Sequence, residues 1–233
     1  MSTRDEVLQQ VPGWDQDRVR EARILVVGAG ALGNEVLKNL ALLNVRRIVI
    51  ADFDRVEMSN LSRSVLFRAE DAHAHRPKAE VAAERLLDLN PNLEILSLNG
   101  DLMCDLGLGL LRNIDVAIAC VDNRLARLYL NRWCFRVGIP WVNGGILNLS
   151  GQVSSYQMGH SCYECGLTKI GWKDIRERMG CTDMARRYAM SGQVPTTPIS
   201  ASIIAAIQVQ EALKLFRGQK EQSLLGKMFS YEG

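Results

Sequence analysis

The sequence of 233 residues lacks several features that would place it in a functional class. Its charge has no dominant sign, because 28 Lys and Arg stand against 26 Asp and Glu, so neither nucleic acid nor an anionic membrane is an expected partner. No apolar run reaches about 18 residues, and the N-terminus is polar, which argues against a membrane span or signal peptide. No internal repeat or low-complexity tract is present. These absences predict a soluble, cytoplasmic protein with one sizeable core.

Cysteine is present, but the expected compartment argues against a disulfide framework. A cytoplasmic chain of this size keeps its thiols reduced. Cys104, Cys120 and Cys134 lie in mostly apolar segments, where cysteine behaves as a small core residue. The other three cysteines lie in a polar, irregular stretch and are treated separately below.

Short apolar runs alternate with helical patterns over the first 145 residues. A strand, a helix and a second strand within about 30 residues make a βαβ unit, which has parallel strands and a right-handed crossover. The pattern predicts an α/β fold with a Rossmann-like, doubly wound, mostly parallel sheet. Strands are predicted at 24–27, 47–51, 93–98, 115–121 and 140–143, and helices at 31–43, 77–89 and 125–137.

The remainder of the chain has a different character. Residues 151–157 alternate in polarity, as in an antiparallel strand, and residues 227–231 resemble a final strand. Between them lie a long crossover loop at about 159–198 and an apolar helix at 199–216. A loop of that length inside a compact domain is usually functional. The predicted division is an N-terminal arm at 1–23 and one domain at 24–233.

A glycine-rich turn connects the first predicted strand to the first predicted helix. Such a turn lets the backbone approach a ligand closely, and the helix N-terminus presents unpaired N–H groups to phosphate. Asp52 falls 19 residues after the last glycine, where a carboxylate can accept hydrogen bonds from ribose hydroxyls. The alternative is that Asp52 or Asp54 only caps a loop. The turn comprises Gly28, Gly30, Ala31 and Gly33.

Polar residues beyond the second strand suit phosphate better than a nicotinamide cofactor. Arg63 follows Asn60 in a loop and carries a planar fork of donors, and Lys78 begins the next helix. Taken alone, Lys78 is a solvated surface residue. Asp122 and Asn123 follow the fourth strand, at the sheet edge where ligands bind, and Asp122 suits Mg²⁺. Their alternative role is to cap the next helix.

Together these segments resemble one family, the ubiquitin-activating-type adenylating enzymes, which include bacterial activators of sulfur-carrier proteins. The resemblance covers roughly residues 22–232. It implies binding of ATP and Mg²⁺, and adenylation of the C-terminal glycine of a ubiquitin-like or sulfur-carrier protein with release of pyrophosphate. The motifs are Gly28-x-Gly-x-x-Gly33, Asp52-Phe-Asp54, Ser59-Asn-Leu-Ser-Arg63, Arg76-Pro-Lys78 and Cys120-Val-Asp-Asn123.

The resemblance assigns a role to most of these positions. Asp52 resembles the residue that binds the ribose. Asn60, Arg63 and Lys78 resemble the residues that contact the triphosphate. Asp122 resembles the Mg²⁺ ligand. Charge develops as a carboxylate attacks the α-phosphorus, so Arg63, Lys78 and Asp122 are candidate catalytic residues. The implied nucleotide site comprises Gly28, Gly30, Ala31, Gly33, Asp52, Asp54, Ser59, Asn60, Arg63, Lys78, Asp122 and Asn123.

The cysteines of the crossover loop suggest two further sites. Cys162 and Cys165 have the spacing of half a tetrahedral Zn²⁺ site, which related bacterial enzymes complete with a second pair near the C-terminus. No such pair appears before Gly233, so the sequence leaves open whether Zn²⁺ binds here. The alternative is that the two cysteines form a redox pair. Cys181 resembles the thioester-forming cysteine of activating enzymes. Its alternative is an unreactive loop cysteine.

The expected partners are the modifier protein, a conjugating enzyme and a second copy of the chain, since two-fold dimers are the commonest oligomers. The family's N-terminal Arg-Tyr-x-Arg-Gln motif is absent, which leaves Arg4, Arg18 and Arg20 as candidate replacements. Two other functions remain as alternatives. An NAD-dependent Rossmann oxidoreductase would explain the glycines and Asp52 but would leave Arg63 without a role. A non-catalytic partner subunit of an activating complex would keep the fold without the reaction.

Overall fold

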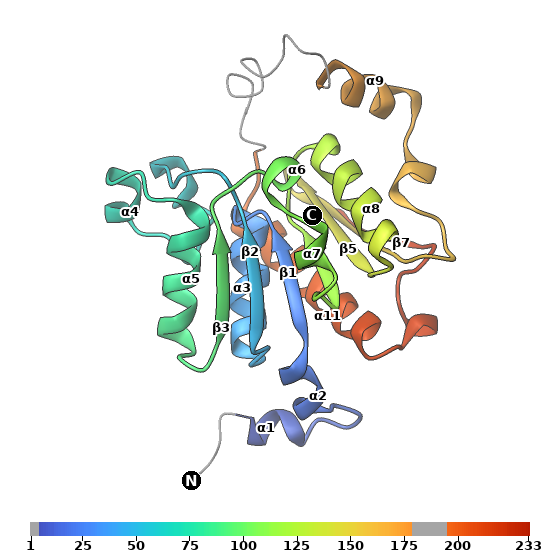
Figure 1. Ribbon diagram of the computed structural model, residues 1–233. Helices are drawn as coiled ribbons and strands as arrows, with labels where there is room; N and C mark the ends of the chain where they lie inside the picture. The colour runs from blue at the N-terminus through green and yellow to red at the C-terminus, as the bar shows by residue number, and fades with distance from the viewer. Residues whose placement is uncertain (1–4, 179–194) are drawn as a thin grey trace.

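A mixed sheet of seven strands forms the centre of the computed structural model, which describes residues 5–178 and 195–233 (Figure 1). The strand order is β3-β2-β1-β4-β5-β6-β7. The strands are β1 Arg23–Val27, β2 Arg47–Ala51, β3 Glu94–Leu98, β4 Val116–Ala119, β5 Trp141–Leu147, β6 Ser150–Tyr156 and β7 Met228–Tyr231. The main helices are α3 Ala31–Leu42, α5 Lys78–Leu89, α8 Arg124–Val137, α9 Lys169–Arg178 and α11 Pro198–Phe216.

Strand direction confirms the predicted fold class. β3, β2, β1, β4 and β5 pair in parallel, whereas β5–β6 and β6–β7 pair antiparallel. The register places Val27 beside both Ala51 and Ala119, so β1, β2 and β4 end at the same level. The segments that follow these three strands therefore meet at one edge of the sheet.

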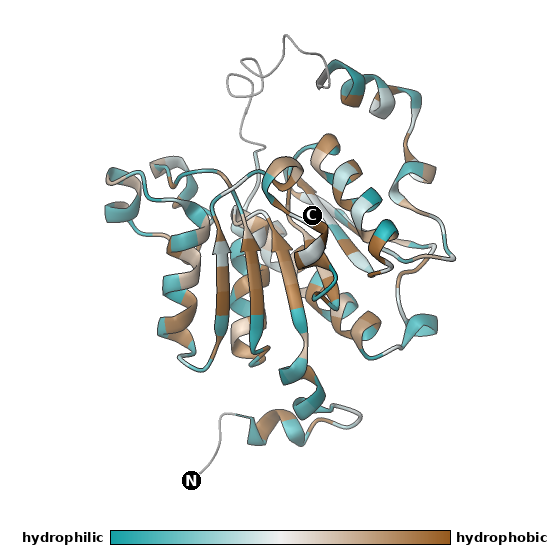
Figure 2. Cartoon of the chain, viewed as in Figure 1, coloured by the Kyte–Doolittle hydropathy of each residue, from teal (hydrophilic) through white to brown (hydrophobic). Residues whose placement is uncertain are grey.

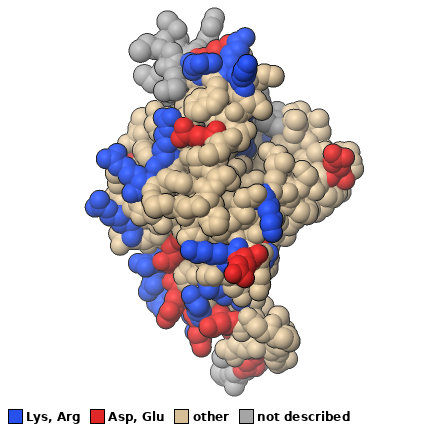
Figure 3. Space-filling view, turned by 90° about the vertical axis from the view of Figure 1, so that its right-hand side faces the viewer, with Lys and Arg blue, Asp and Glu red and all other residues tan. Residues whose placement is uncertain are grey.

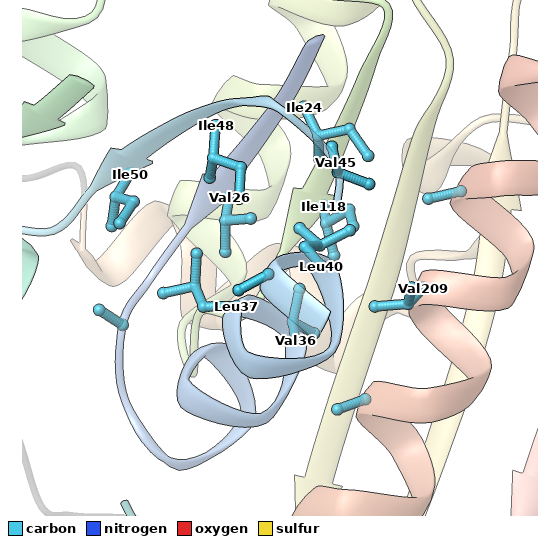
Figure 4. Close-up of a cluster of buried hydrophobic side chains, with 14 of the residues drawn as sticks. Ile24, Val26, Val36, Leu37, Leu40, Val45, Ile48, Ile50, Ile118 and Val209 are labelled. Carbon is cyan, nitrogen blue, oxygen red and sulfur yellow. The ribbon is translucent and has the colours of Figure 1, made fainter. Parts of the chain in front are cut away.

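Helices cover both faces of the central strands β1 and β4, and nearly all residues of these two strands are apolar and buried (Figure 2). On one face, Ile24, Val26 and Ile50 pack with residues of α3, α5 and α11 (Figure 4). On the other face, Leu25 and Val27 pack with α8. Each fully buried side chain of this size contributes about 1.5–3 kcal/mol, so the sheet is a stable platform for its loops.

Helix α11 is a core helix of this fold. By length and composition alone it could cross a membrane, because it has 19 residues and an 18-residue stretch of it has a mean hydropathy of 1.3. Ten of those residues are buried, however, including Ile204, Val209 and Leu213. The helix packs along α3 and against β5, so the burial of its apolar surface is explained within the domain.

The N-terminal arm packs on the amino edge of the sheet, opposite the loops described below. It contains α1 Glu6–Gln9 and α2 Gln16–Glu21. Buried Asp5 forms an ion pair with Arg20 and accepts a hydrogen bond from Asn44 at 2.9 Å. Arg18 donates to the carbonyl oxygen of Phe216. Two of the candidate arginines are therefore held far from the glycine turn, and Arg4 lies outside the described residues.

Two short helices, α6 Leu102–Asp105 and α7 Leu108–Leu111, connect β3 to β4 and were not predicted. They correct one prediction: Leu102 faces the core, but Cys104 is exposed, because a four-residue helix buries only one side. Cys134 is buried as predicted. α4 Ala69–His73 and the 3-10 helices η1 Met58–Asn60, η2 Tyr163–Gly166 and η4 Lys220–Gln222 complete the elements.

The first half of the predicted crossover loop contains regular structure. η2 and α9 occupy its first half, and α9 packs on α8 through Ile175, Trp172 and Leu125. Residues 179–194, including Cys181, lie outside the described residues. On the face that Figure 3 shows, Lys and Arg side chains lie interspersed with Asp and Glu, in keeping with the balanced composition.

Candidate functional site

The glycine turn forms where the carboxyl ends of β1 and β4 meet. Gly28 has φ 93°, and a Cβ on it would lie 2.6 Å from the carbonyl oxygen of Cys120. A Cβ on Gly33 would lie 1.9 Å from the carbonyl oxygen of Gly28. Both positions therefore exclude a side chain for packing reasons. A Cβ on Gly30 would meet no described atom within 4 Å, so this glycine borders open space.

Helix α3 points its N-terminus into that open space. Gly30 is its N-cap and offers no side chain to the first turn, whose N–H groups have no partner within the helix. Those groups and the helix dipole favour an anion, and the lack of a side chain on Gly30 leaves room for one to approach. The predicted phosphate-binding turn is thus present in a form that fits a phosphate.

Asp52 is fastened to this turn. The backbone N–H of Ala29 donates to its Oδ2 at 2.6 Å, and the N–H of Asp54 donates to Oδ1 at 2.7 Å. Burial raises the pKa of the Asp52 carboxyl, while the Lys78 ammonium and the two N–H donors act against that rise. Asp52 therefore does more than cap a loop, because it ties the end of β2 to the glycine turn.

Lys78 is buried, which rules out the surface role that its sequence position alone suggested. Its side chain is 11% exposed, and Nζ lies 2.8 Å from Oδ2 of Asp54. The pairing is fixed by the backbone, since the N–H of Lys78 also donates to the carbonyl oxygen of Asp54 at 2.9 Å. The structure thus brings Asp52, Asp54 and Lys78 together at the end of β2.

The loop with Arg63 is built around η1. Oδ1 of buried Asn60 accepts from the N–H of Glu57 at 3.0 Å, and Nη1 of Arg63 donates to the carbonyl oxygen of Ser59 at 2.9 Å. Asn60 therefore shapes the loop through its side chain. One guanidinium nitrogen of Arg63 is anchored to the backbone, which restricts where the rest of the donor fork can lie.

The sequence left open whether Asp122 and Asn123 face a ligand or cap α8, and the structure distinguishes the two residues. Oδ1 of Asn123 accepts from the N–H of Ala126 at 2.7 Å, which caps α8. Asp122 is exposed at the carboxyl edge of β4, and within the described residues its carboxylate makes no hydrogen bond or ion pair. One exposed carboxylate fits Mg²⁺, which takes few protein ligands and shares the phosphates of its nucleotide.

Cys162 and Cys165 form a close pair on η2, with their Sγ atoms 3.5 Å apart. Glu164 between them holds the turn on α8 through two hydrogen bonds from Arg132 at 3.0 and 3.2 Å. Partial burial opposes ionisation of Cys162, but hydrogen bonds from Cys165, Glu164 and Asn131 outweigh it and lower the pKa of this thiol. Within residues 5–178 and 195–233, no group of three or more His, Cys, Asp or Glu side chains is arranged to hold a metal ion, so only half a zinc site is described.

Two residues that the sequence did not suggest help to build the site. Asn34 lies fully buried on α3 and bonds to the glycine turn. Arg127 donates from Nη2 to the carbonyl oxygens of Val121 at 2.6 Å and Gly144 at 3.2 Å, which holds the strand end that carries Asp122. A polar residue in the apolar stripe of α3 was a signal for Asn34, whereas an arginine on a helix gave none for Arg127.

Comparison with known proteins places this chain in a family. Residues 3–233 match the ThiF family over nearly the whole chain. The chain belongs to the ThiF family. The Escherichia coli molybdopterin-synthase adenylyltransferase is 30% identical over 93% of this chain and 81% of its own length. The Thermus thermophilus sulfur carrier protein adenylyltransferase is 32% identical over 92% of this chain and 76% of its own length.

Other relatives of this ThiF-family chain are longer than it is. Subunit 2 of the SUMO-activating enzyme from Dictyostelium discoideum is 36% identical over 64% of this chain, which spans only 22% of that subunit. The crystal structure of Escherichia coli MccB has a TM-score of 0.72 over 94% of this chain and 62% of MccB. At 23% identity, MccB shows the shared fold only.

The raised pKa of Asp52 gives a testable prediction of pH dependence. Because the folded-state pKa lies above the unfolded value, folding favours the protonated carboxyl, and this contribution is lost as the pH rises through the folded pKa. The variant Asp52→Asn has no such titration. The free energy of unfolding of the wild type relative to Asp52→Asn should therefore decrease as the pH rises above about 4. Urea unfolding over a pH series measures it, and a pH-independent difference would contradict the assignment.

Proposed function

We propose that this chain uses ATP and Mg²⁺ to adenylate the C-terminus of a ubiquitin-like or sulfur-carrier protein in the cytoplasm. One observation carries the proposal: the glycine turn, Asp52 and the Asp54–Lys78 pair are tied together at one sheet edge of a ThiF-family chain. The names of its relatives, which are adenylyltransferases and a SUMO-activating subunit, support the same reaction class.

In the proposed reaction, a carboxylate oxygen of the modifier attacks the α-phosphorus of ATP. The bond from that phosphorus to the bridging oxygen of the β-phosphate breaks, and pyrophosphate leaves. The N–H groups at the start of α3, Arg63 and Lys78 stabilise the negative charge that develops on the phosphates. Asp52 holds the ribose hydroxyls, so the α-phosphorus stays fixed while the carboxylate approaches.

Mg²⁺ would be held by Asp122 together with phosphate oxygens, and when bound it supplies charge neutralisation at the triphosphate. Arg127 supports this arrangement because it holds the carbonyl oxygen of Val121, the residue before Asp122.

Calorimetry distinguishes the proposal from an oxidoreductase. The chain should bind ATP with Mg²⁺, and binding of NAD in preference to ATP would overturn the adenylation function.

Exchange of labelled pyrophosphate into ATP tests the reaction itself. We expect exchange only when a ubiquitin-like or sulfur-carrier protein with a free C-terminus is present, because its carboxylate is the second substrate. A modifier that lacks its last residue is the control. A chain that binds ATP but supports no exchange with any such protein would instead be a non-catalytic partner subunit.

Cys181 provides a separate prediction about the second step. Its Sγ would attack the acyl carbon of the adenylate, the bond to the AMP oxygen would break, and the thiol proton would pass to solvent. We expect a reducible adduct between the chain and the modifier, observed by non-reducing electrophoresis. The variant Cys181→Ala should lose this adduct and keep pyrophosphate exchange. An adduct that persists in Cys181→Ala would exclude this cysteine, and Cys104→Ala is the matched control.

The proposed assembly is a homodimer that receives the modifier and passes it to an acceptor such as a conjugating enzyme. Light scattering of the purified chain measures the oligomeric state, and a monomer would contradict the dimer.

Zn²⁺ on Cys162 and Cys165 remains a proposal that needs further ligands from outside the described residues. Metal analysis of protein purified without chelators tests it.

A further inference from the structure

The side chain of Asn34 contacts two separate parts of the nucleotide site. Its Nδ2 donates to the carbonyl oxygen of Ala29 at 2.6 Å and to that of Gly30 at 3.1 Å. Its Oδ1 accepts from the N–H of Leu66 at 2.8 Å. Asn34 has no exposed surface, so water cannot replace these bonds. The nitrogen and the oxygen of one buried carboxamide are therefore both bonded to backbone groups, and these groups belong to two different loops.

The bonds to the glycine turn determine where its N–H groups point. Because Nδ2 holds the carbonyl oxygens of Ala29 and Gly30 toward the helix, the amide planes of the turn are fixed. The N–H groups that follow are then directed to the open space beside Gly30. An anion site made of backbone N–H groups depends on such a fixed orientation, since the groups cannot reorient without breaking other bonds.

The bond to Leu66 fixes the second loop. Leu66 lies three residues after Arg63, and its side chain and that of Ser64 are buried, so the end of this loop is anchored in the core. The N–H of Leu66 joins that anchor to α3 through Oδ1 of Asn34. The side chain of Asn34 thus links the helix N-terminus to the end of the Arg63 loop by hydrogen bonds, beside the apolar packing of Leu66.

We propose that Asn34 is a positioning residue that couples the phosphate-binding turn to Arg63, so that both act on one triphosphate. The proposal rests on the proposed function, because it concerns the same ATP site. Asn34 itself does not touch the nucleotide. It acts by holding the two groups that do, and a shift of about 1 Å in such groups can cost a factor of about 100 in rate.

Asn90 provides a matched control for a purely structural role. It also has no exposed surface, and its Nδ2 donates to the carbonyl oxygen of Ala41 at 3.2 Å and to Oδ1 of Asn44 at 2.8 Å. Its Oδ1 accepts from the N–H of Asn92 at 3.2 Å. Ala41 and Asn34 are seven residues apart on α3, which separates the two networks by about 10 Å. Loss of either carboxamide removes two donated hydrogen bonds and one accepted hydrogen bond from the protein interior.

The experiment compares Asn34→Ala with Asn90→Ala by thermal unfolding and by calorimetric titration with ATP and Mg²⁺. Both variants should unfold at a lower temperature than the wild type. Only Asn34→Ala should weaken ATP binding, by about tenfold or more. Equal effects of the two variants on ATP affinity would overturn the proposal, whereas failure of the wild type to bind ATP would overturn the proposed function instead.

A double-mutant cycle then tests the coupling to Arg63. Arg63→Ala should weaken ATP binding by about tenfold or more in the wild-type background, as expected for a charge-assisted contact. In the Asn34→Ala background the same change should cost about threefold or less, because the guanidinium is no longer held in register. In the Asn90→Ala background it should keep its full effect. Additive losses for Asn34 and Arg63 would show that Asn34 has no positioning role.

Discussion

Asp122→Ala should reduce modifier-dependent pyrophosphate exchange by a factor of about 100–1000, the range seen when one group that stabilises developing charge is removed. Asp122 is exposed at the end of β4, and no described residue depends on its carboxylate for a hydrogen bond or ion pair. The free energy of unfolding of Asp122→Ala should therefore stay within about 1 kcal/mol of the wild-type value. Isotope exchange and calorimetry measure the two effects.

Its neighbour is the control. Asn123→Ala removes the cap of α8 and should cost about 1 kcal/mol of stability, yet exchange should persist, because the cap does not face the phosphates. Asp122→Ala is thus expected to lower activity and keep stability, whereas Asn123→Ala is expected to lower stability and keep activity. Normal exchange in Asp122→Ala with Mg²⁺ as the only divalent ion would show that the metal ligand lies elsewhere.

Substitution of two glycines in the same turn should have different consequences. In Gly33→Ala the new methyl group would lie 1.9 Å from the carbonyl oxygen of Gly28, so the turn and α3 must move apart. Overpacking against backbone should cost about 3 kcal/mol. For a chain of this size that corresponds to a decrease of about 6–12 °C in Tm. Differential scanning calorimetry measures the decrease.

Gly30→Ala is expected to leave stability nearly unchanged, since its methyl group meets no described atom within 4 Å. It would instead occupy the space that we assign to phosphate, and ATP affinity should fall by about tenfold or more. A variant that keeps wild-type affinity would place the phosphates outside this space. The pair separates a glycine needed by the fold from a glycine needed by the ligand.

The sequence predicted the sheet well because each buried strand is a short apolar run with clear boundaries. β2 at Arg47–Ala51 has the predicted limits, and β1 begins at Arg23, one residue before its predicted start. The connection between β3 and β4 was missed because α6 and α7 have only four residues each, too few to show a helical period. Cys104 was wrongly placed in the core for that reason.

For the site, spacing identified the segments but not their mutual contacts. The burial of Lys78 follows from the pairing of its backbone with Asp54, 24 residues earlier, and no local pattern shows such a contact. The division of roles between Asp122 and Asn123 likewise depends on which side chain turns toward α8. Asn34 stands out as a polar residue in the apolar stripe of α3, but its role was overlooked because its partners are backbone groups of Ala29, Gly30 and Leu66, which no sequence pattern shows.

Helix α3 joins two ends of the molecule that should respond to different events. Its first turn borders the glycine turn. Near its other end, the carbonyl oxygen of Leu43 accepts a hydrogen bond from Gln16 of the N-terminal arm, and Asn44 donates one to Asp5 of the same arm. Amide hydrogens of residues 31–33 lack partners within the helix and should exchange with solvent deuterium quickly until a nucleotide covers them. Those near residue 43 should report only on detachment of the arm. Hydrogen exchange at the start of α3 therefore reports on nucleotide binding, whereas exchange at its end reports on the packing of the N-terminal arm.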